Sequence, residues 1–209
     1  MRGPDEEGTV DGARRIVVVG DELVAGAGDP RGLGWVGRVA ARTPEEPRPT
    51  FLTLAVPGET TTSLAQRWEH EVTPRLLTPE PEHGHLMVVA LGRADLAGGV
   101  SLARSRLNLA NILDVADQRR IACFVVGPPP TTLADPDAQA ELSSAFADVS
   151  GRRRVPYVET YGPLAQHDQW LADMADGDGA TPGQVGYGLM AWLVLHTGWS
   201  RWLGLPDDV

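Results

Sequence analysis

Five short apolar runs, separated by longer amphipathic segments, constrain the fold of this chain more than any other feature. Several runs are continuously apolar rather than alternating in polarity, which is typical of strands that helices cover on both faces. The predicted strands are Arg15–Gly20, Thr50–Val56, Leu86–Leu91, Ile121–Gly127 and Val155–Glu159. The predicted helices are Trp35–Arg42, Thr61–Leu77, Ser101–Arg119, Asp137–Arg152, Leu164–Ala175 and Gly183–Thr197.

This alternation of strands and helices predicts an α/β fold with a parallel sheet. Right-handed crossovers between parallel strands place helices on both faces, so we expect a three-layer α/β/α sandwich around five parallel strands. Ligands of such folds bind beyond the carboxyl ends of the strands, where the connecting loops gather. Residues that directly follow a strand are therefore the first candidates for a functional site.

Length and charge narrow the class of protein. The 209 residues suit a single domain, which we expect over residues 14–209 after a flexible polar tail at 1–13. A net charge of −10 argues against nucleic acid and membrane surfaces as partners.

The start lacks the pattern of a signal peptide and no apolar run approaches the ~20 residues of a membrane span, so we expect a cytoplasmic protein. The lone Cys123, within a predicted strand, indicates a buried thiol.

Four short blocks carry the functional signal, and each lies in a connecting loop of the predicted fold. The first is Gly20-Asp21-Glu22-Leu23, and the second runs from Leu54 to Thr61 around Gly58. The third, Leu91-Gly92-Arg93-Ala94-Asp95, follows the third strand, and the fourth, Asp178-Gly179-Ala180-Thr181-Pro182, precedes the last helix. Each block alone is typical of a turn or a helix start, so the signal lies in their order.

In that order the blocks resemble those of the SGNH (GDSL) hydrolase family. The resemblance implies a flavodoxin-like SGNH hydrolase fold and an esterase or lipase that needs no cofactor. It implies that Glu22, Asp178 and Thr181 stand at the positions of the family's catalytic serine, aspartate and histidine. It further implies that Gly58 supplies an oxyanion-hole N–H, and that Ala94 replaces the asparagine that is the other donor.

These departures remove most of the family's chemistry. A serine esterase needs a nucleophile, a base and oxyanion donors, and the chain matches only Asp178 and Gly58. Glu22 also adds negative charge where an oxyanion would form. Of the five histidines, His167 is the only plausible substitute base, because its segment leads directly into the Asp178 loop, and a surface position on a helix is the simpler interpretation of it. We therefore expect a poor or inactive serine esterase, a pseudoenzyme with a small-ligand pocket.

Three arrangements of the pocket carboxylates remain open. In the one we rank first, Arg93 neutralises Glu22. In the second, Glu22 and Asp178 act as a general acid–base pair in an active hydrolase of small acyl or glycosidic substrates. In the third, ranked last, Glu22 and Asp178, with Glu59 or Asp95, hold a hard cation.

The remaining expectations concern partners. A small acyl ester or a carbohydrate is the ligand class that the resemblance implies, and Asp21 and Asp95 complete the candidate pocket. The apolar end of the chain is expected to pack back on its own domain in preference to forming a dimer contact, so that either a monomer or a homodimer is compatible with the sequence. Its apolar residues are Trp192, Trp199, Trp202, Leu203 and Leu205.

Overall fold

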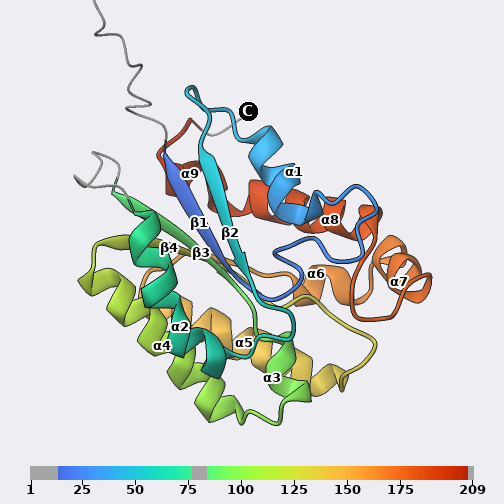
Figure 1. Cartoon of the computed structure of the whole chain (residues 1–209). Coiled ribbons are helices and arrows are strands. Elements are labelled where there is room, and N and C mark those ends of the chain that lie inside the picture. The colour runs from blue at the N-terminus through green and yellow to red at the C-terminus, as the bar shows by residue number, and fades with distance from the viewer. Residues whose placement is uncertain (1–13, 77–83, 207–209) are drawn as a thin grey trace, which may run out of the picture.

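The computed structural model describes residues 14–76 and 84–206 (Figure 1). The predicted tail at 1–13 and the end of the second predicted helix at Leu77 lie outside the described residues. The strands are β1 (Arg15–Gly20), β2 (Thr50–Ala55), β3 (His85–Ala90), β4 (Ile121–Val126) and β5 (Tyr157–Val158). The helices are α1 (Gly34–Arg42), α2 (Thr61–Val72), α3 (Arg93–Ala97), α4 (Leu102–Gln118), α5 (Pro136–Arg152), α6 (Tyr161–Ala165), α7 (Asp168–Ala175), α8 (Gln184–Val194) and α9 (Ser200–Leu203).

The strands form one parallel sheet in the order β2-β1-β3-β4-β5, which confirms the predicted five-stranded parallel sheet. β1 lies between β2 and β3, and its last residue, Gly20, pairs with Ala55 on one side and Ala90 on the other. Three strands therefore end at the same level. The loops that follow β1, β2 and β3 meet at this carboxyl edge, as expected for a fold of this class.

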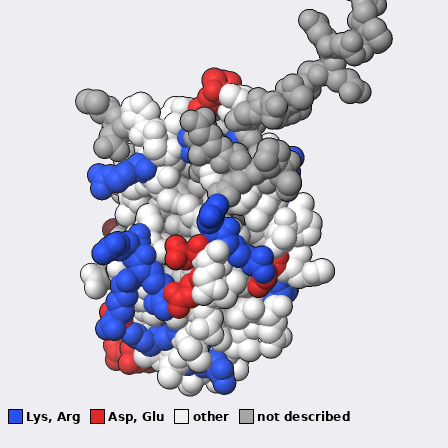
Figure 2. Space-filling view, turned by 90° about the vertical axis from the view of Figure 1, so that its left-hand side faces the viewer, with Lys and Arg blue, Asp and Glu red and all other residues white. Residues whose placement is uncertain are grey.

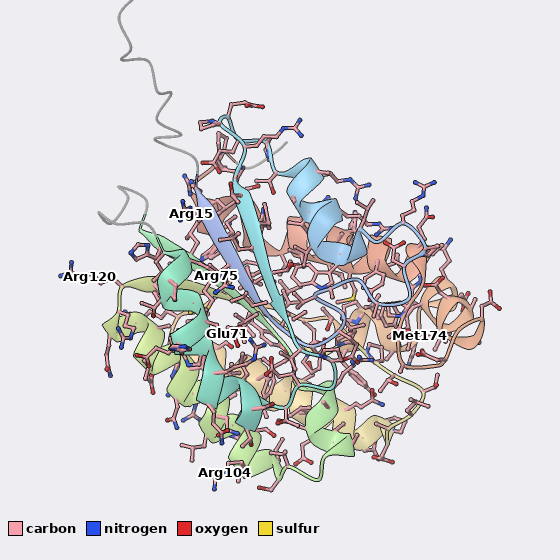
Figure 3. All side chains as sticks on the ribbon, viewed as in Figure 1. Arg15, Glu71, Arg75, Arg104, Arg120 and Met174 are labelled. Atoms are coloured by element: carbon pink, nitrogen blue, oxygen red, sulfur yellow. The ribbon has the colours of Figure 1, made fainter. Side chains whose placement is uncertain are left out.

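Helices cover both faces of the sheet, in agreement with the predicted three layers (Figure 1). One layer consists of α1, α8 and α9, and Val18 of β1 packs against it. The other consists of α2, α4 and α5, and Val17 of β1 packs against that side. Side chains fill the space between the sheet and each layer, and Met174 of α7 is buried in the first of these two cores (Figure 3). This two-sided burial explains why the strand sequences read as continuous apolar runs.

The last described residues of the chain pack on the sheet, as predicted. A π-type turn (Leu195–Trp199) links α8 to α9, and within it Trp199 is buried against Phe51 and Phe124, with ring centroids 6.1 and 5.3 Å away. Trp192 differs, because it lies on the outer side of α8, is 55% exposed and stacks on His196 at 4.4 Å. Helical periodicity separates these residues, since a core-facing stripe cannot include every tryptophan of the segment.

Several elements differ from the expectation, among them α9, a four-residue helix that was not predicted. The short helix α3 was not predicted, because five residues after a glycine carry too little periodicity to be recognised. The predicted helix Leu164–Ala175 is interrupted between α6 and α7, where His167 occupies the N-cap position of α7 without a side-chain capping bond. The predicted strand Val155–Glu159 contributes only two residues to the sheet, as β5.

Arginines and acidic residues lie side by side on the face shown in Figure 2. Ion pairs link neighbouring helices: Arg119 at the end of α4 contacts Glu69 of α2, and Arg106 of α4 contacts Asp148 of α5. At the amino edge of the sheet, Arg15 donates a hydrogen bond to the carbonyl of Arg75 (3.3 Å; Figure 3). Within the described residues, no helix combines the length and the apolar character that crossing a membrane requires.

Gly20, the last residue of β1, packs closely against the backbone of β3, just before the loop that forms part of the candidate site. A Cβ atom at this position would lie 1.9 Å from the carbonyl oxygen of Ala90 in β3. That neighbour is backbone within the sheet and cannot move aside. Glycine is therefore needed where β1 turns into the loop that carries Asp21 and Glu22.

We expect Gly20→Ala to destabilise the fold by about 3 kcal/mol or more, at the upper end of overpacking costs. A matched control is Gly151→Ala near the end of α5, where an added Cβ meets nothing within 4 Å. Alanine there should leave stability unchanged or raise it by up to ~1 kcal/mol, because it favours helix. Urea denaturation followed by circular dichroism measures both, and equal stabilities for the two variants would contradict this account.

Candidate functional site

The candidate site lies at the carboxyl edge of the sheet, where four loops meet. Glu22 follows β1, Gly58 follows β2, and Arg93 is the first residue of α3 after β3. The fourth loop, between α7 and α8, contains Ala180. Side chains from separate parts of the sequence therefore meet at this edge because parallel strands all end there.

Glu22 is held from two sides. One carboxylate oxygen, Oε2, accepts a hydrogen bond from the backbone N–H of Gly58 at 2.7 Å. The other, Oε1, lies 2.5 Å from Nη2 of Arg93, so the ion pair that the sequence analysis ranked first is present. The Glu22 carboxylate is thus hydrogen-bonded to the Gly58 N–H, the group that the family resemblance assigned to an oxyanion hole.

Arg93 connects three parts of the site. Its guanidinium bonds Glu22, donates to the carbonyl of Ala180 in the α7–α8 loop, and places Nε 3.7 Å from Oδ2 of Asp21. The side chain is only 9% exposed. A buried guanidinium with carboxylates on two sides fixes the spacing of these loops, because its planar donors have defined directions.

Asp21 is the buried carboxyl group of the site. Its side chain is 4% exposed, and Oδ1 accepts a hydrogen bond from the N–H of Leu23 at 3.0 Å. Burial raises the pKa of Asp21 to about 6; the charge of Arg93 opposes this shift and that of Glu22 adds to it. Asp21 is thus a carboxyl group that titrates close to neutral pH.

Asp178 and Thr181 form a local loop structure. Oδ1 of Asp178 accepts hydrogen bonds from the N–H groups of Ala180 (2.8 Å) and Thr181 (2.6 Å) and from the Thr181 hydroxyl (3.0 Å). The Thr181 N–H and then the Ala180 N–H hold the pKa of Asp178 below its usual range. An exposed carboxylate held ionised in this way is poorly suited to donate a proton as a general acid.

Two further carboxylates considered from sequence point away from the groove. Asp95 is fully buried and accepts hydrogen bonds from Thr61 (2.7 Å to both its N–H and its hydroxyl) and from the Ser105 hydroxyl (2.5 Å). Glu59 is buried in an ion pair with Arg67. Both carboxylates anchor α2. In the described part of the chain, no group of three or more His, Cys, Asp or Glu side chains is placed to hold a metal ion.

An open groove of about 500 Å³ adjoins Glu22. Gly58, Arg93 and Ala94 line it as the sequence analysis expected, but its far wall comes from the β4–α5 loop and the start of α5, which no motif indicated. The only sequence signal there is the Pro-rich stretch at 127–130 after a strand. The wall residues missed from sequence are Thr131, Leu133, Ala134, Asp135 and Ala138.

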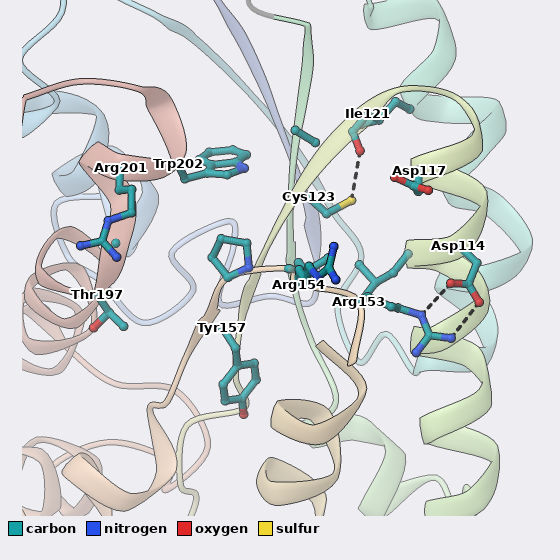
Figure 4. A pocket seen from close by; sticks show the side chains of 15 residues that line it. Asp114, Asp117, Ile121, Cys123, Arg153, Arg154, Tyr157, Thr197, Arg201 and Trp202 are labelled. Atoms are coloured by element: carbon teal, nitrogen blue, oxygen red, sulfur yellow. Dashed lines mark hydrogen bonds and ion pairs between the residues drawn. The ribbon is translucent and has the colours of Figure 1, made fainter. Parts of the chain in front are cut away.

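A larger hollow of about 870 Å³ lies at the opposite, amino edge of the sheet, beside β4 and α9 (Figure 4). Cys123 lines it, but burial raises the pKa of this thiol to about 12. The thiol therefore stays protonated, which agrees with the predicted structural role. Arg153 on the same wall is paired with Asp114 at 2.7 Å. We place the candidate site at the carboxyl edge because the sequence blocks converge there.

Comparison with known proteins points to one family. The sequence model of the GDSL-like lipase/acylhydrolase family matches residues 18–189. A search of curated proteins gave no significant match.

Solved structures share the fold. A lipase/acylhydrolase from Enterococcus faecalis is 21% identical with a TM-score of 0.74, covering 94% of this chain and 99% of that one. An esterase from a Pseudoalteromonas species is 16% identical with a TM-score of 0.70, covering 91% and 99%. An acetylxylan esterase from Geobacillus stearothermophilus is 14% identical with a TM-score of 0.69, covering 94% and 96%.

The buried Asp21 predicts a defined pH dependence. Because its pKa is about 6 when folded and about 4 when unfolded, the folded protein binds this proton more tightly. The resulting stabilisation is fully present below about pH 4 and is lost as the pH rises through about 6. Asp21→Asn lacks this titration, so the stability of the variant relative to the parent should rise by up to ~3 kcal/mol between pH 4 and 7.

Urea denaturation of the parent and Asp21→Asn at several pH values measures this difference, and titrations elsewhere in the chain cancel in it. A stability difference that stays constant across the range would show that Asp21 titrates normally.

Proposed function

The chain belongs to the GDSL-like lipase/acylhydrolase family, and on this premise we propose that it uses the family fold to bind a small ligand without serine-based hydrolysis. The observation that carries the proposal is the pair of contacts made by Glu22. Its carboxylate accepts a hydrogen bond from the Gly58 N–H at 2.7 Å and forms an ion pair with the Arg93 guanidinium at 2.5 Å. The position of the family's nucleophile is thus filled by an ion-paired acid.

The missing groups support this proposal. A carboxylate at position 22 has no hydroxyl to activate, and Thr181 offers no base to activate one. Ala94 provides no side-chain donor, and the loss of one oxyanion donor typically costs about 10²–10³ in rate. With the Gly58 N–H already engaged, an oxyanion in this place would have to displace Glu22 and form beside its charge.

The groove next to Glu22 supports a binding role. It is open to solvent, and most of its lining is apolar, as in many small-molecule sites. By family, a small acyl ester is the expected ligand class. A carbohydrate ester is the variant suggested by the acetylxylan esterase among the structural relatives.

One observation favours an alternative, a hydrolase that works through Glu22 and Asp178. Glu22 remains 23% exposed at the groove, so a substrate or a water molecule can approach it. Against this, Asp178 is held ionised by its own loop and does not supply the acid of an acid–base pair. We therefore rank binding above this alternative.

We expect the purified protein to hydrolyse short-chain aryl esters no faster than its Glu22→Ala variant, because neither has a nucleophile and base. Release of the chromogenic alcohol is measured, with circular dichroism to verify that both are folded. Activity in the parent that disappears in Glu22→Ala would establish a carboxylate-based enzyme and overturn the proposal.

A second expectation tests whether the backbone is still an esterase scaffold. The triple variant Glu22→Ser, Ala94→Asn and Thr181→His restores the family's nucleophile, oxyanion donor and base. It should hydrolyse the same esters faster than the parent by about 10²-fold or more, because it gains a nucleophile and a base together with a donor whose loss alone typically costs that much. The double variant Ala94→Asn, Thr181→His is the matched control and should remain inert. A folded but inert triple variant would refute the assignment of these positions.

A further inference from the structure

Negatively charged side chains outnumber positively charged ones along the groove. Glu22 and Asp135 place two carboxylates on its lining, and Arg93 supplies the one guanidinium among the described lining residues. Asp21 lies behind Arg93 at 3.7 Å and adds further negative charge when ionised. The groove therefore favours a positively charged ligand over a negatively charged one.

The hydrogen-bonding groups have the same bias. A carboxylate has about four acceptor sites, and in Glu22 the Gly58 N–H and Arg93 take one each. Glu22 can therefore accept further hydrogen bonds from a ligand at its exposed edge. The Gly58 N–H is bonded to Glu22, and Arg93 uses Nη1 on the Ala180 carbonyl and Nη2 on Glu22. The remaining nitrogen of Arg93, Nε, makes no hydrogen bond to the described residues, but it is buried and faces Asp21, not the groove. An anionic ligand would therefore have to compete with Glu22 for these two groups.

The remainder of the groove is suited to an aliphatic chain. Its apolar lining comes from α3 and from the loop and helix that follow β4, and Leu133 is 70% exposed. The apolar residues from these elements are Ala94, Leu96, Ala97, Leu133, Ala134 and Ala138. Burying an aliphatic chain against such a wall contributes binding free energy in proportion to the apolar area covered.

We propose that the groove binds an apolar chain bearing a protonated amine, whose ammonium group donates to Glu22. The inference rests on the ligand-binding function proposed above and names its ligand class. It inverts the polarity of a site that binds an oxyanion, because the resident carboxylate already bonds the Gly58 N–H and Arg93 and keeps free acceptor sites at the groove.

Three probes of matched length separate charge from chain: hexylamine, 1-hexanol and hexanoate, titrated by isothermal calorimetry at about pH 7, where the amine is protonated. We expect hexylamine to bind more tightly than hexanol by about tenfold or more, as a charge-assisted hydrogen bond warrants. Hexanoate should bind more weakly than hexanol.

The matched variant is Glu22→Gln, which keeps the shape and an acceptor but removes the charge. It should abolish most of the preference for hexylamine over hexanol, whatever its effect on the binding of hexanol itself. Glu46→Gln is the control for the acidity of the whole protein, since Glu46 is 83% exposed and lies before β2, at the opposite edge of the sheet. It should leave all three affinities unchanged.

The outcomes distinguish the two proposals. If hexanol binds but hexylamine has no advantage, or if the advantage persists in Glu22→Gln or falls equally in Glu46→Gln, the amine inference is wrong and the binding function stands. If none of the three probes binds, the groove does not take small aliphatic ligands, and the proposed function fails together with the inference.

Discussion

The ion pair between Glu22 and Arg93 is the interaction on which the rest of the site depends. Glu22 joins the β1 loop to the β2 loop through the Gly58 N–H, and Arg93 joins the β3 loop to the α7–α8 loop through the Ala180 carbonyl. One salt bridge therefore connects all four loops. Because Arg93 is nearly buried, removing either partner would leave a charge poorly compensated, which costs far more than loss of a surface pair.

This network occupies the place where the family resemblance puts a serine, a histidine and an aspartate. The catalytic arrangement would hold the same loops together by hydrogen bonds between those side chains. Here Asp178 holds only its own loop, through Ala180 and Thr181. The connection to the β1 loop passes instead through Arg93. A long, planar cation can span the distance between these loops without offering a base.

Much of the fold could be predicted from sequence, because strands buried on both faces leave continuous apolar runs and parallel topology follows from their alternation with helices. The site was predictable in part. The blocks placed Glu22, Arg93 and Gly58 in neighbouring loops, but their contacts depend on side-chain reach, which spacing does not encode. Asp95 looked equivalent to Glu22 in sequence, yet it bonds Thr61 and Ser105 inside the fold. The groove wall around Leu133 has no motif, since apolar contact needs only shape.

Acyl transfer is accelerated when donors meet negative charge that develops in the transition state, so those donors must be unsatisfied or weakly used beforehand. In this chain the Gly58 N–H already binds a full negative charge, and so does the one cation beside it. If position 22 is that of the nucleophile, as we propose, the groups that would serve an oxyanion are therefore already bonded in the ground state, and less stabilisation remains to be gained as a reaction proceeds. Under the proposed binding function, the same carboxylate is a fixed negative group beside an apolar groove.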